Sequence, residues 1–174
     1  MDRLKLEAHP EVLCLAVQQR AKFEGWLKFE LAAAASRDGA SDLRVEVPLP
    51  ACADRGDLGF TLDGEPYLVE LKTPNSNWRL SGVESRTRPI TKNISAIKAD
   101  VEKMRRAGGG IVAFVLFPVP HGDQRWEAYL KRISTELDAA SHCSEVGVDL
   151  ADDCRATATA CAFAVAGMSH SGAQ

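Results

Sequence analysis

Two acidic residues and one lysine on neighbouring predicted strands could form a catalytic centre. Glu70 and Lys72 are separated by one residue, and because side chains alternate between the two faces of a strand, both point to the same side. Asp57 lies on the preceding predicted strand, and the Asp63-Gly64 pair between the two strands is typical of a tight hairpin turn. Pairing of the strands around this turn would bring Asp57 close to Glu70.

The types of these three residues favour hydrolysis of a phosphate ester. Two carboxylates held close together repel each other unless a cation lies between them. Mg²⁺ binds a few carboxylate oxygens and keeps several of its waters, which suits phosphate chemistry. A lysine beside such an ion could orient or deprotonate the attacking water, or stabilise charge in the transition state. We therefore expect Asp57 and Glu70 to bind Mg²⁺, for which Mn²⁺ should substitute, with Lys72 beside the ion.

The elements that must position these residues form a single predicted α/β domain over residues 1–166, followed by a flexible tail over 167–174. Apolar periodicity and turn residues indicate a mixed central sheet flanked by helices. We expect helices over 11–35, 90–107 and 123–140 and strands over 43–49, 57–62, 67–73 and 111–119, followed by one or two late strands, for which the candidates are 146–150 and 158–165.

The spacing of Asp57 and Glu70-x-Lys72 around a predicted hairpin resembles the PD-(D/E)xK nuclease superfamily. That superfamily has a restriction endonuclease-like α-β-β-β-α-β core, and the order of elements predicted over 23–118 matches it. One departure is Gly56, which stands where the family motif has proline. The resemblance implies metal-dependent hydrolysis of phosphodiester bonds in nucleic acid, with DNA favoured over RNA and with Asp57, Glu70 and Lys72 as catalytic residues.

Members of this superfamily often add a glutamate from the first helix to the metal site. Glu30 is at the matching position, and on the predicted helix it falls on or beside the apolar stripe. Glu24, on the more polar side of the helix, is an alternative for this role. Glu46 and Asp54 could also approach the metal.

A basic segment follows the Glu70-x-Lys72 strand. Residues 72–106 contain nine basic and three acidic residues, although the net charge of the chain is −3. Such a local basic surface can bind a phosphate backbone, and the alternative interpretation is a solvated helix face. The residues expected to contact nucleic acid are Trp78, Arg79, Arg86, Arg88, Lys92, Asn93 and Lys98.

Two other interpretations of the whole chain stay open. It could be a non-catalytic nucleic-acid-binding or protein-interaction module that keeps the nuclease fold, because a fold does not determine a function. It could also be an unrelated α/β protein in which the E-x-K spacing is a coincidence.

Composition predicts a soluble, cytoplasmic protein without a membrane partner. No apolar stretch approaches the roughly 20 residues of a membrane span, and the N-terminus lacks the layout of a secretory signal. The five cysteines show no C-x-x-C spacing, so we expect reduced thiols. The small size suggests that a homodimer or a partner protein supplies targeting.

Overall fold

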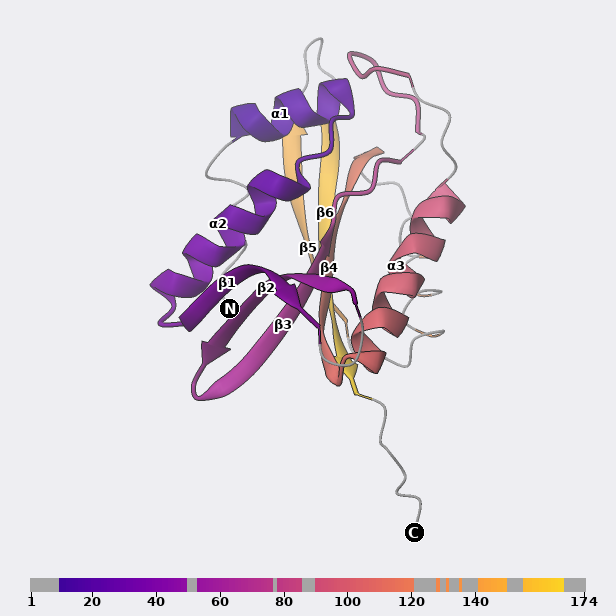
Figure 1. Cartoon of the computed structure of the whole chain (residues 1–174). Coiled ribbons are helices and arrows are strands. Elements are labelled where there is room, and N and C mark those ends of the chain that lie inside the picture. The colour runs from indigo at the N-terminus through magenta and orange to yellow at the C-terminus, as the bar shows by residue number, and fades with distance from the viewer. Residues whose placement is uncertain are drawn as a thin grey trace.

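The computed structural model describes residues 10–49, 53–76, 78–85, 90–120, 141–149 and 155–167, together with positions 128, 131 and 135. These residues form three named helices and six strands (Figure 1). In chain order they are α1 (Pro10–Gln19), α2 (Glu24–Arg37), β1 (Ser41–Pro48), β2 (Arg55–Leu62), β3 (Glu65–Lys72), α3 (Ile90–Arg106), β4 (Gly109–Pro120), β5 (Ser141–Asp149) and β6 (Arg155–Ala166).

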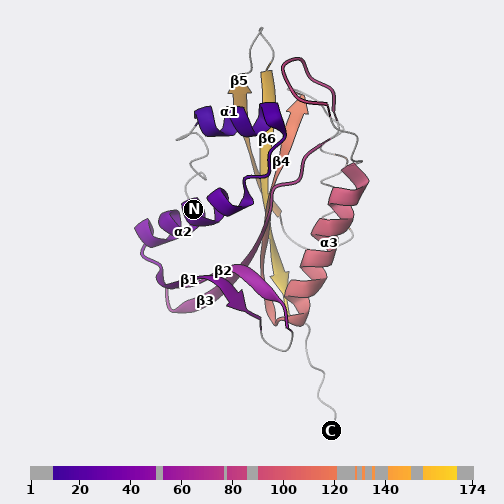
Figure 2. The same ribbon diagram turned by 45° about the horizontal axis from the view of Figure 1, so that its top comes forward.

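The six strands form one mixed sheet in the order β1-β2-β3-β4-β6-β5. Only β3 and β4 pair in parallel, and α3 connects them, as a parallel pair requires a long crossover. Helices α1 and α2 cover one face of the sheet and α3 covers the other (Figures 1 and 2). The predicted α/β class, with a mixed sheet between helices, is therefore confirmed.

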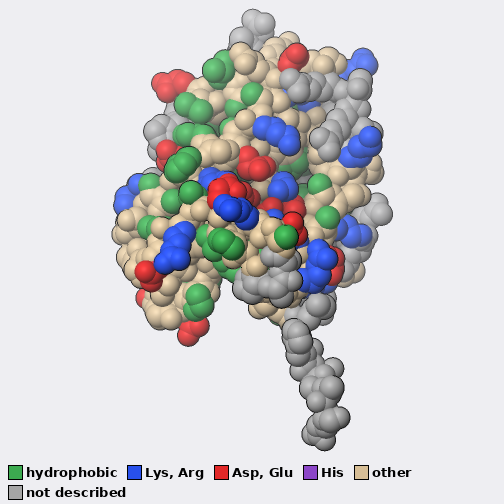
Figure 3. Space-filling model, in the orientation of Figure 1, with side chains coloured by type: hydrophobic (Ala, Val, Ile, Leu, Met, Phe, Trp, Pro, Cys, Tyr) green, Lys and Arg blue, Asp and Glu red, His purple; other side chains and the backbone are tan. Residues whose placement is uncertain are grey.

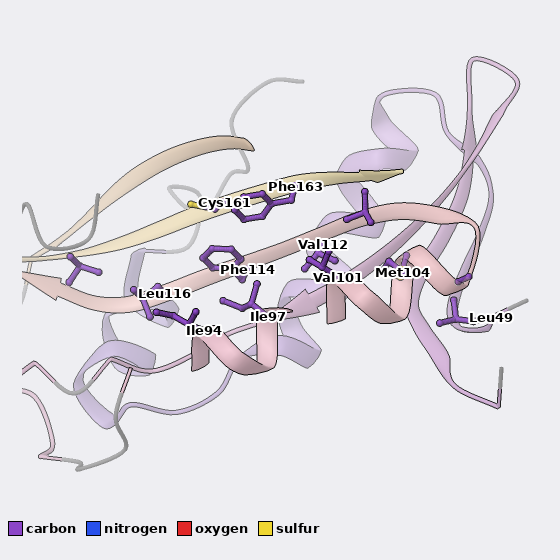
Figure 4. Close-up of a cluster of buried hydrophobic side chains, with 13 residues drawn as sticks. Leu49, Ile94, Ile97, Val101, Met104, Val112, Phe114, Leu116, Cys161 and Phe163 are labelled. Carbon is purple, nitrogen blue, oxygen red and sulfur yellow. The ribbon is translucent and has the colours of Figure 1, made fainter. Parts of the chain in front are cut away.

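The hydrophobic core lies on both faces of β4. On one face, Val101 and Met104 of α3 pack with Phe114 of β4 and Phe163 of β6 (Figure 4). On the other face, Phe117 of β4 belongs to a second cluster with side chains of α1 and α2. The nearly continuous apolar run of β4 is explained by this double coverage, because residues 114–119 are buried on both faces of the strand.

The hairpin predicted at Asp63-Gly64 is confirmed. Leu62 of β2 pairs directly with Glu65 of β3, which leaves a two-residue loop. Asp63 and Gly64 have φ angles of 54° and 82°. Two consecutive positive φ angles are the geometry that Asp-Gly hairpin turns favour.

The single helix predicted over 11–35 is wrong, because the structure divides it into α1 and α2. The break lies at Arg20, whose φ is 48° and whose side chain is only 1% exposed. The Arg20 guanidinium donates hydrogen bonds to the backbone carbonyls of Ser76, Trp78 and Glu84. These long-range bonds fix a non-helical backbone in a segment that local propensity alone would continue as helix.

The later part of the chain agrees with the prediction where it is described. Both late strands form, as β5 and β6, and each is longer than expected. The predicted helix over 123–140 lies mostly outside the described residues; Ala128, Lys131 and Thr135 are helical and exposed. The tail beyond position 167 also lies outside them.

One cysteine differs from expectation. Cys161 of β6 is disulfide-bonded, so the prediction of reduced thiols is wrong for this residue. The antiparallel register of β5 and β6 sets Cys143 opposite Cys161. This register depends on which strands become neighbours in the sheet, and the spacing of the cysteines along the sequence does not reveal it. Cys14 is free.

None of the helices in the described ranges combines the length and the apolar character needed to cross a bilayer.

Candidate functional site

The β2–β3 hairpin brings Asp57 to Glu70, as the sequence predicts. Leu58 pairs with Val69, so continuation of the antiparallel register by one residue sets Asp57 opposite Glu70. Asp57 Oδ2 accepts a hydrogen bond from the backbone N–H of Leu71 at 2.8 Å. Leu58, Val69 and Leu71 are buried in one apolar cluster, and because side chains alternate along a strand, Asp57 and Glu70 lie on the opposite face.

Glu70 is a buried carboxylate with a lysine on each oxygen. Its side chain is 5% exposed. Oε1 accepts a hydrogen bond from Lys72 Nζ at 3.0 Å, and Oε2 accepts one from Lys103 Nζ at 2.8 Å. A charged carboxylate is costly to bury unless it is paired and hydrogen-bonded, and both conditions are met here.

Lys72 lies between two acids. Its Nζ is 3.0 Å from Glu70 Oε1 and 3.6 Å from Asp100 Oδ2 of α3. Burial by itself lowers the pKa of Lys72, but the hydrogen bond to Glu70 and the charges of Glu70, Asp100 and Glu24 outweigh it, so the pKa is raised. Lys72 is therefore an ammonium ion at neutral pH.

Asp100 is a third acid at the site that the sequence analysis does not single out. Burial raises the pKa of its carboxyl to about 6; the charge of Lys72 opposes this rise, and the charge of Glu70 adds to it. Oδ2 is buried and makes no hydrogen bond to the described residues. A sequence signal exists, because Asp100 follows the apolar residue Ile97 by three positions and precedes Met104 by four, which places it beside the buried stripe of α3.

Asp57 is paired with a lysine from a different helix. Lys28 of α2 lies 2.8 Å from Asp57 Oδ1 and also contacts Glu46 Oε1 of β1. Burial by itself lowers the pKa of Lys28. The hydrogen bonds to Asp57 and Glu46 and the charges of these two residues outweigh that effect, so the pKa is raised. Lys28 and Lys103 thus supply the positive charge that the sequence analysis expects from Mg²⁺.

The helix glutamate that reaches the site is Glu24, the first residue of α2. It lines the same pocket as Lys72 and contributes to the raised pKa of Lys72. Glu30 is partly buried on α2. It follows Lys28 by two residues, which is about 200° around a helix, so Glu30 and Lys28 lie on different sides. Asp54 is exposed and precedes β2.

A pocket adjoins this charged cluster. It has a volume of about 130 Å³ and lies where the start of α2, the end of β3 and α3 meet. Figure 3 shows acidic and basic side chains gathered near the centre of the face on this side of the molecule. The residues lining the pocket are Lys22, Glu24, Lys72, Thr73, Pro74, Asn75, Asn93, Ala96 and Ile97.

The residues predicted to contact nucleic acid divide into two groups. Arg79 and Lys92 are exposed, and Lys98 is partly buried. Trp78 packs against the apolar cluster beneath α3, and Asn93 is buried and donates a hydrogen bond to the carbonyl of Asn75. Both of these side chains therefore contribute to the fold itself.

The remaining predicted contacts, Arg86 and Arg88, lie outside the described residues.

The donor set offers two carboxylates to a divalent ion. Among the described residues, no three His, Cys, Asp or Glu side chains lie close enough together to form a metal site. Asp57 and Glu70 alone would suit Mg²⁺, which usually takes one or two carboxylates and completes its shell with waters and substrate oxygens. The two side chains therefore fit such an ion, provided that the lysines on their oxygens move away.

The chain has no significant match among protein families, curated proteins or solved structures. Its function therefore has to be inferred from the chemistry of the site.

Proposed function

We propose that this chain is a metal-dependent nuclease of the PD-(D/E)xK kind, which hydrolyses phosphodiester bonds in DNA. The observation that carries the proposal is the position of Asp57 opposite Glu70 across a two-residue hairpin, with Lys72 on the same face beside a pocket. The order α2-β1-β2-β3-α3-β4 supports it, because it is the α-β-β-β-α-β order of the nuclease core.

The proposed roles follow from the contacts of each side chain. Asp57 and Glu70 would hold Mg²⁺ or Mn²⁺, and Glu24 is better placed than Glu30 to act as the helix carboxylate. A bound divalent ion supplies polarisation of a phosphoryl oxygen and of the attacking water. Lys72 is held as a cation by Glu70 and Asp100, so we assign it to stabilising negative charge on the phosphate rather than to removing a proton.

The lysine pairs make metal binding a competition. Lys28 contacts Asp57 Oδ1, and Lys103 contacts Glu70 Oε2. A divalent ion can bind these oxygens only after the ammonium groups have left them. We therefore expect metal affinity to be modest and activity to require millimolar ion.

The same pairs favour a second candidate function. Because lysines neutralise both carboxylates, the site is electrostatically satisfied without an ion. A non-catalytic DNA-binding module that keeps the nuclease fold would show this arrangement as well.

Cleavage by the purified protein tests the first proposal. With Mg²⁺ or Mn²⁺, the protein should cut linear double-stranded DNA and single-stranded DNA. Glu70→Gln and Lys72→Ala should each lower the cleavage rate by at least about 100-fold. Glu65→Gln is the matched control, because Glu65 is exposed at the other end of the same strand. Metal-dependent cleavage that survives both site changes would rule out this assignment of the site.

Metal binding separates the two candidates. A nuclease site should give a thermal shift with millimolar Mn²⁺ that Glu70→Gln abolishes. DNA binding without cleavage and without any Mn²⁺ shift would instead support the binding module.

A further inference from the structure

One lysine at the pocket differs from the others around the site. Lys28, Lys72 and Lys103 are each ion-paired with carboxylates. Lys22, in the segment between α1 and α2, is exposed and lines the pocket. Within the described part of the chain, Lys22 makes no hydrogen bond or ion pair. It is therefore a positive charge that is available to a ligand.

The pocket has the size and lining for a small anion. Its volume of about 130 Å³ is well above the roughly 10–15 Å³ that a cavity needs to hold one water. That space can take one phosphoryl group. The charged side chains that line it are Lys22, Lys72 and Glu24. Because Lys72 is ion-paired with Glu70 and Asp100, Lys22 is the cation that the lining offers to an anion.

The walls of the pocket are held by hydrogen bonds that do not involve a ligand. Asn93 donates to the carbonyl of Asn75, and Asn75 Nδ2 donates to the carbonyl of Arg20 at 2.9 Å. These bonds tie α3, the segment after β3 and the α1–α2 junction together. A cavity between three fixed elements is preorganised, so little ordering cost opposes binding.

Lys72 belongs both to the carboxylate cluster and to the pocket. We propose that the pocket is a second phosphoryl subsite, in which Lys22 binds a phosphate of the DNA strand next to the phosphate held at Lys72. This inference rests on the proposed nuclease function and names a part of its substrate. The phosphoryl group can be an internal phosphodiester or the phosphate monoester at a strand end, because both present the same oxygens to an ammonium group.

Binding of a single-stranded oligonucleotide in EDTA tests the subsite without cleavage. Fluorescence anisotropy would compare a 3′-labelled strand that carries a 5′-phosphate with one that carries a 5′-hydroxyl. Lys22→Ala should weaken binding about tenfold and reduce the slope of log Kd against log salt by about 0.7 to 1. Arg37→Ala is the control, because it removes one exposed positive charge at the other end of α2.

The two strands distinguish the source of the phosphate. Loss of affinity only for the 5′-phosphorylated strand supports a terminal monoester, and equal loss for both strands supports an internal phosphodiester. Equal Kd values and equal salt slopes for Lys22→Ala and Arg37→Ala with both strands would overturn the proposal.

Inorganic phosphate provides an arm that does not depend on DNA. It should raise the Tm of the unsubstituted protein and of Arg37→Ala, and raise that of Lys22→Ala clearly less. If the unsubstituted protein binds no DNA, the proposed substrate class fails, and this arm alone decides on the subsite. If phosphate then leaves the Tm of the unsubstituted protein unchanged, the phosphoryl subsite is rejected.

Discussion

Asp100 is held in the folded chain at an energetic cost. Its carboxyl is buried near Glu70 as well as near Lys72 and Lys103, and its pKa is raised to about 6. Residues whose pKa is strongly displaced often belong to functional sites, where stability is given up for chemistry. The position of Asp100 beside Lys72 agrees with that pattern, because both groups face the proposed reaction centre.

Replacing Asp100 should therefore stabilise the protein at neutral pH. The folded carboxyl keeps its proton up to about pH 6, whereas the unfolded one loses it near 3.8. Between these values the folded state binds more protons, so stability falls as pH rises through this window. Asn stays neutral at all these pH values. The free energy of unfolding of Asp100→Asn should therefore exceed that of the parent by about 2 kcal/mol at pH 7.5, after a discount for solvent screening, and match it near pH 3.5.

Urea unfolding in EDTA at several pH values measures this difference. The matched control is Asp54→Asn, because Asp54 is exposed. If Asp100→Asn and Asp54→Asn respond to pH in the same way, the buried carboxyl does not carry the stated cost.

At the residue scale, prediction from sequence succeeds where the geometry is local. Asp57, Glu70 and Lys72 are placed by strand alternation and by one tight turn, and both can be recognised from neighbouring residues. Lys28 and Lys103 reach the carboxylates from helices, and no local pattern shows which helix residue meets which strand residue. Their role becomes visible only once the helices are packed on the sheet.

The α1–α2 junction holds the segment over 74–85 at the scale of elements. Arg20 donates to the carbonyls of Ser76, Trp78 and Glu84, and the Glu84 N–H donates to the carbonyl of Gln18 at 2.7 Å. Arg79, an expected DNA contact, lies within this segment. The Arg20 guanidinium therefore adds three hydrogen bonds to those by which β4 and α3 hold the start of this segment.

Substitution of Arg20 should loosen this segment. Arg20→Met keeps most of the side-chain length but leaves buried carbonyls without donors, so we expect a loss of about 3 kcal/mol. Arg20→Lys keeps the charge and should lose less. Urea unfolding gives the free energy, and hydrogen exchange at the amides of Ser76 and Glu84 reports on the segment itself.

Arg37→Met, at an exposed position, serves as the control. Exchange rates in residues 76–84 that stay unchanged in Arg20→Met would show that the guanidinium does not order the segment.

Elements are predicted from sequence more reliably than their interruptions. β1 to β4 are predicted to within two residues at each end, because their apolar patterns and turn residues are strong, whereas β5 begins five residues and β6 three residues before the predicted start. The break at Arg20 is missed, since its cause lies more than 50 residues away in the sequence. The same omission hides the position of Glu24, because one continuous helix does not show that Glu24 begins a new helix beside the pocket.

At the scale of the whole molecule, the pairing of acids with lysines determines whether folding depends on a bound metal ion. Asp57 and Glu70 are neutralised by side chains of α2 and α3, which also build the core. Neither Asp57 nor Glu70 is therefore left as an uncompensated charge that needs an ion for the chain to fold. This situation differs from small zinc domains, in which metal binding supplies the folding energy.

Removal of divalent ions should therefore leave the fold intact. EDTA should change the Tm by less than about 1 °C, and circular dichroism should keep its native form, while any DNA cleavage stops. Glu70→Gln in the same buffers is the comparison, because it removes the charge of the proposed ligand and nearly keeps its shape, although the amide nitrogen can no longer accept a hydrogen bond from a lysine. A fall in Tm of more than about 5 °C in EDTA would indicate a structural ion instead.

The ammonium groups of Lys28 and Lys103 also set the concentration of divalent ion that is needed to occupy the proposed metal site. An ion must outcompete two tethered amines whose effective concentration is fixed by the helices that carry them. Under the proposed function, the chain can be synthesised and folded in an ion-poor medium, and the same molecules become competent for cleavage when the surrounding Mg²⁺ or Mn²⁺ rises. The lysines of α2 and α3, rather than the β2–β3 hairpin that carries the proposed catalytic residues, would then set the ion concentration that activity needs.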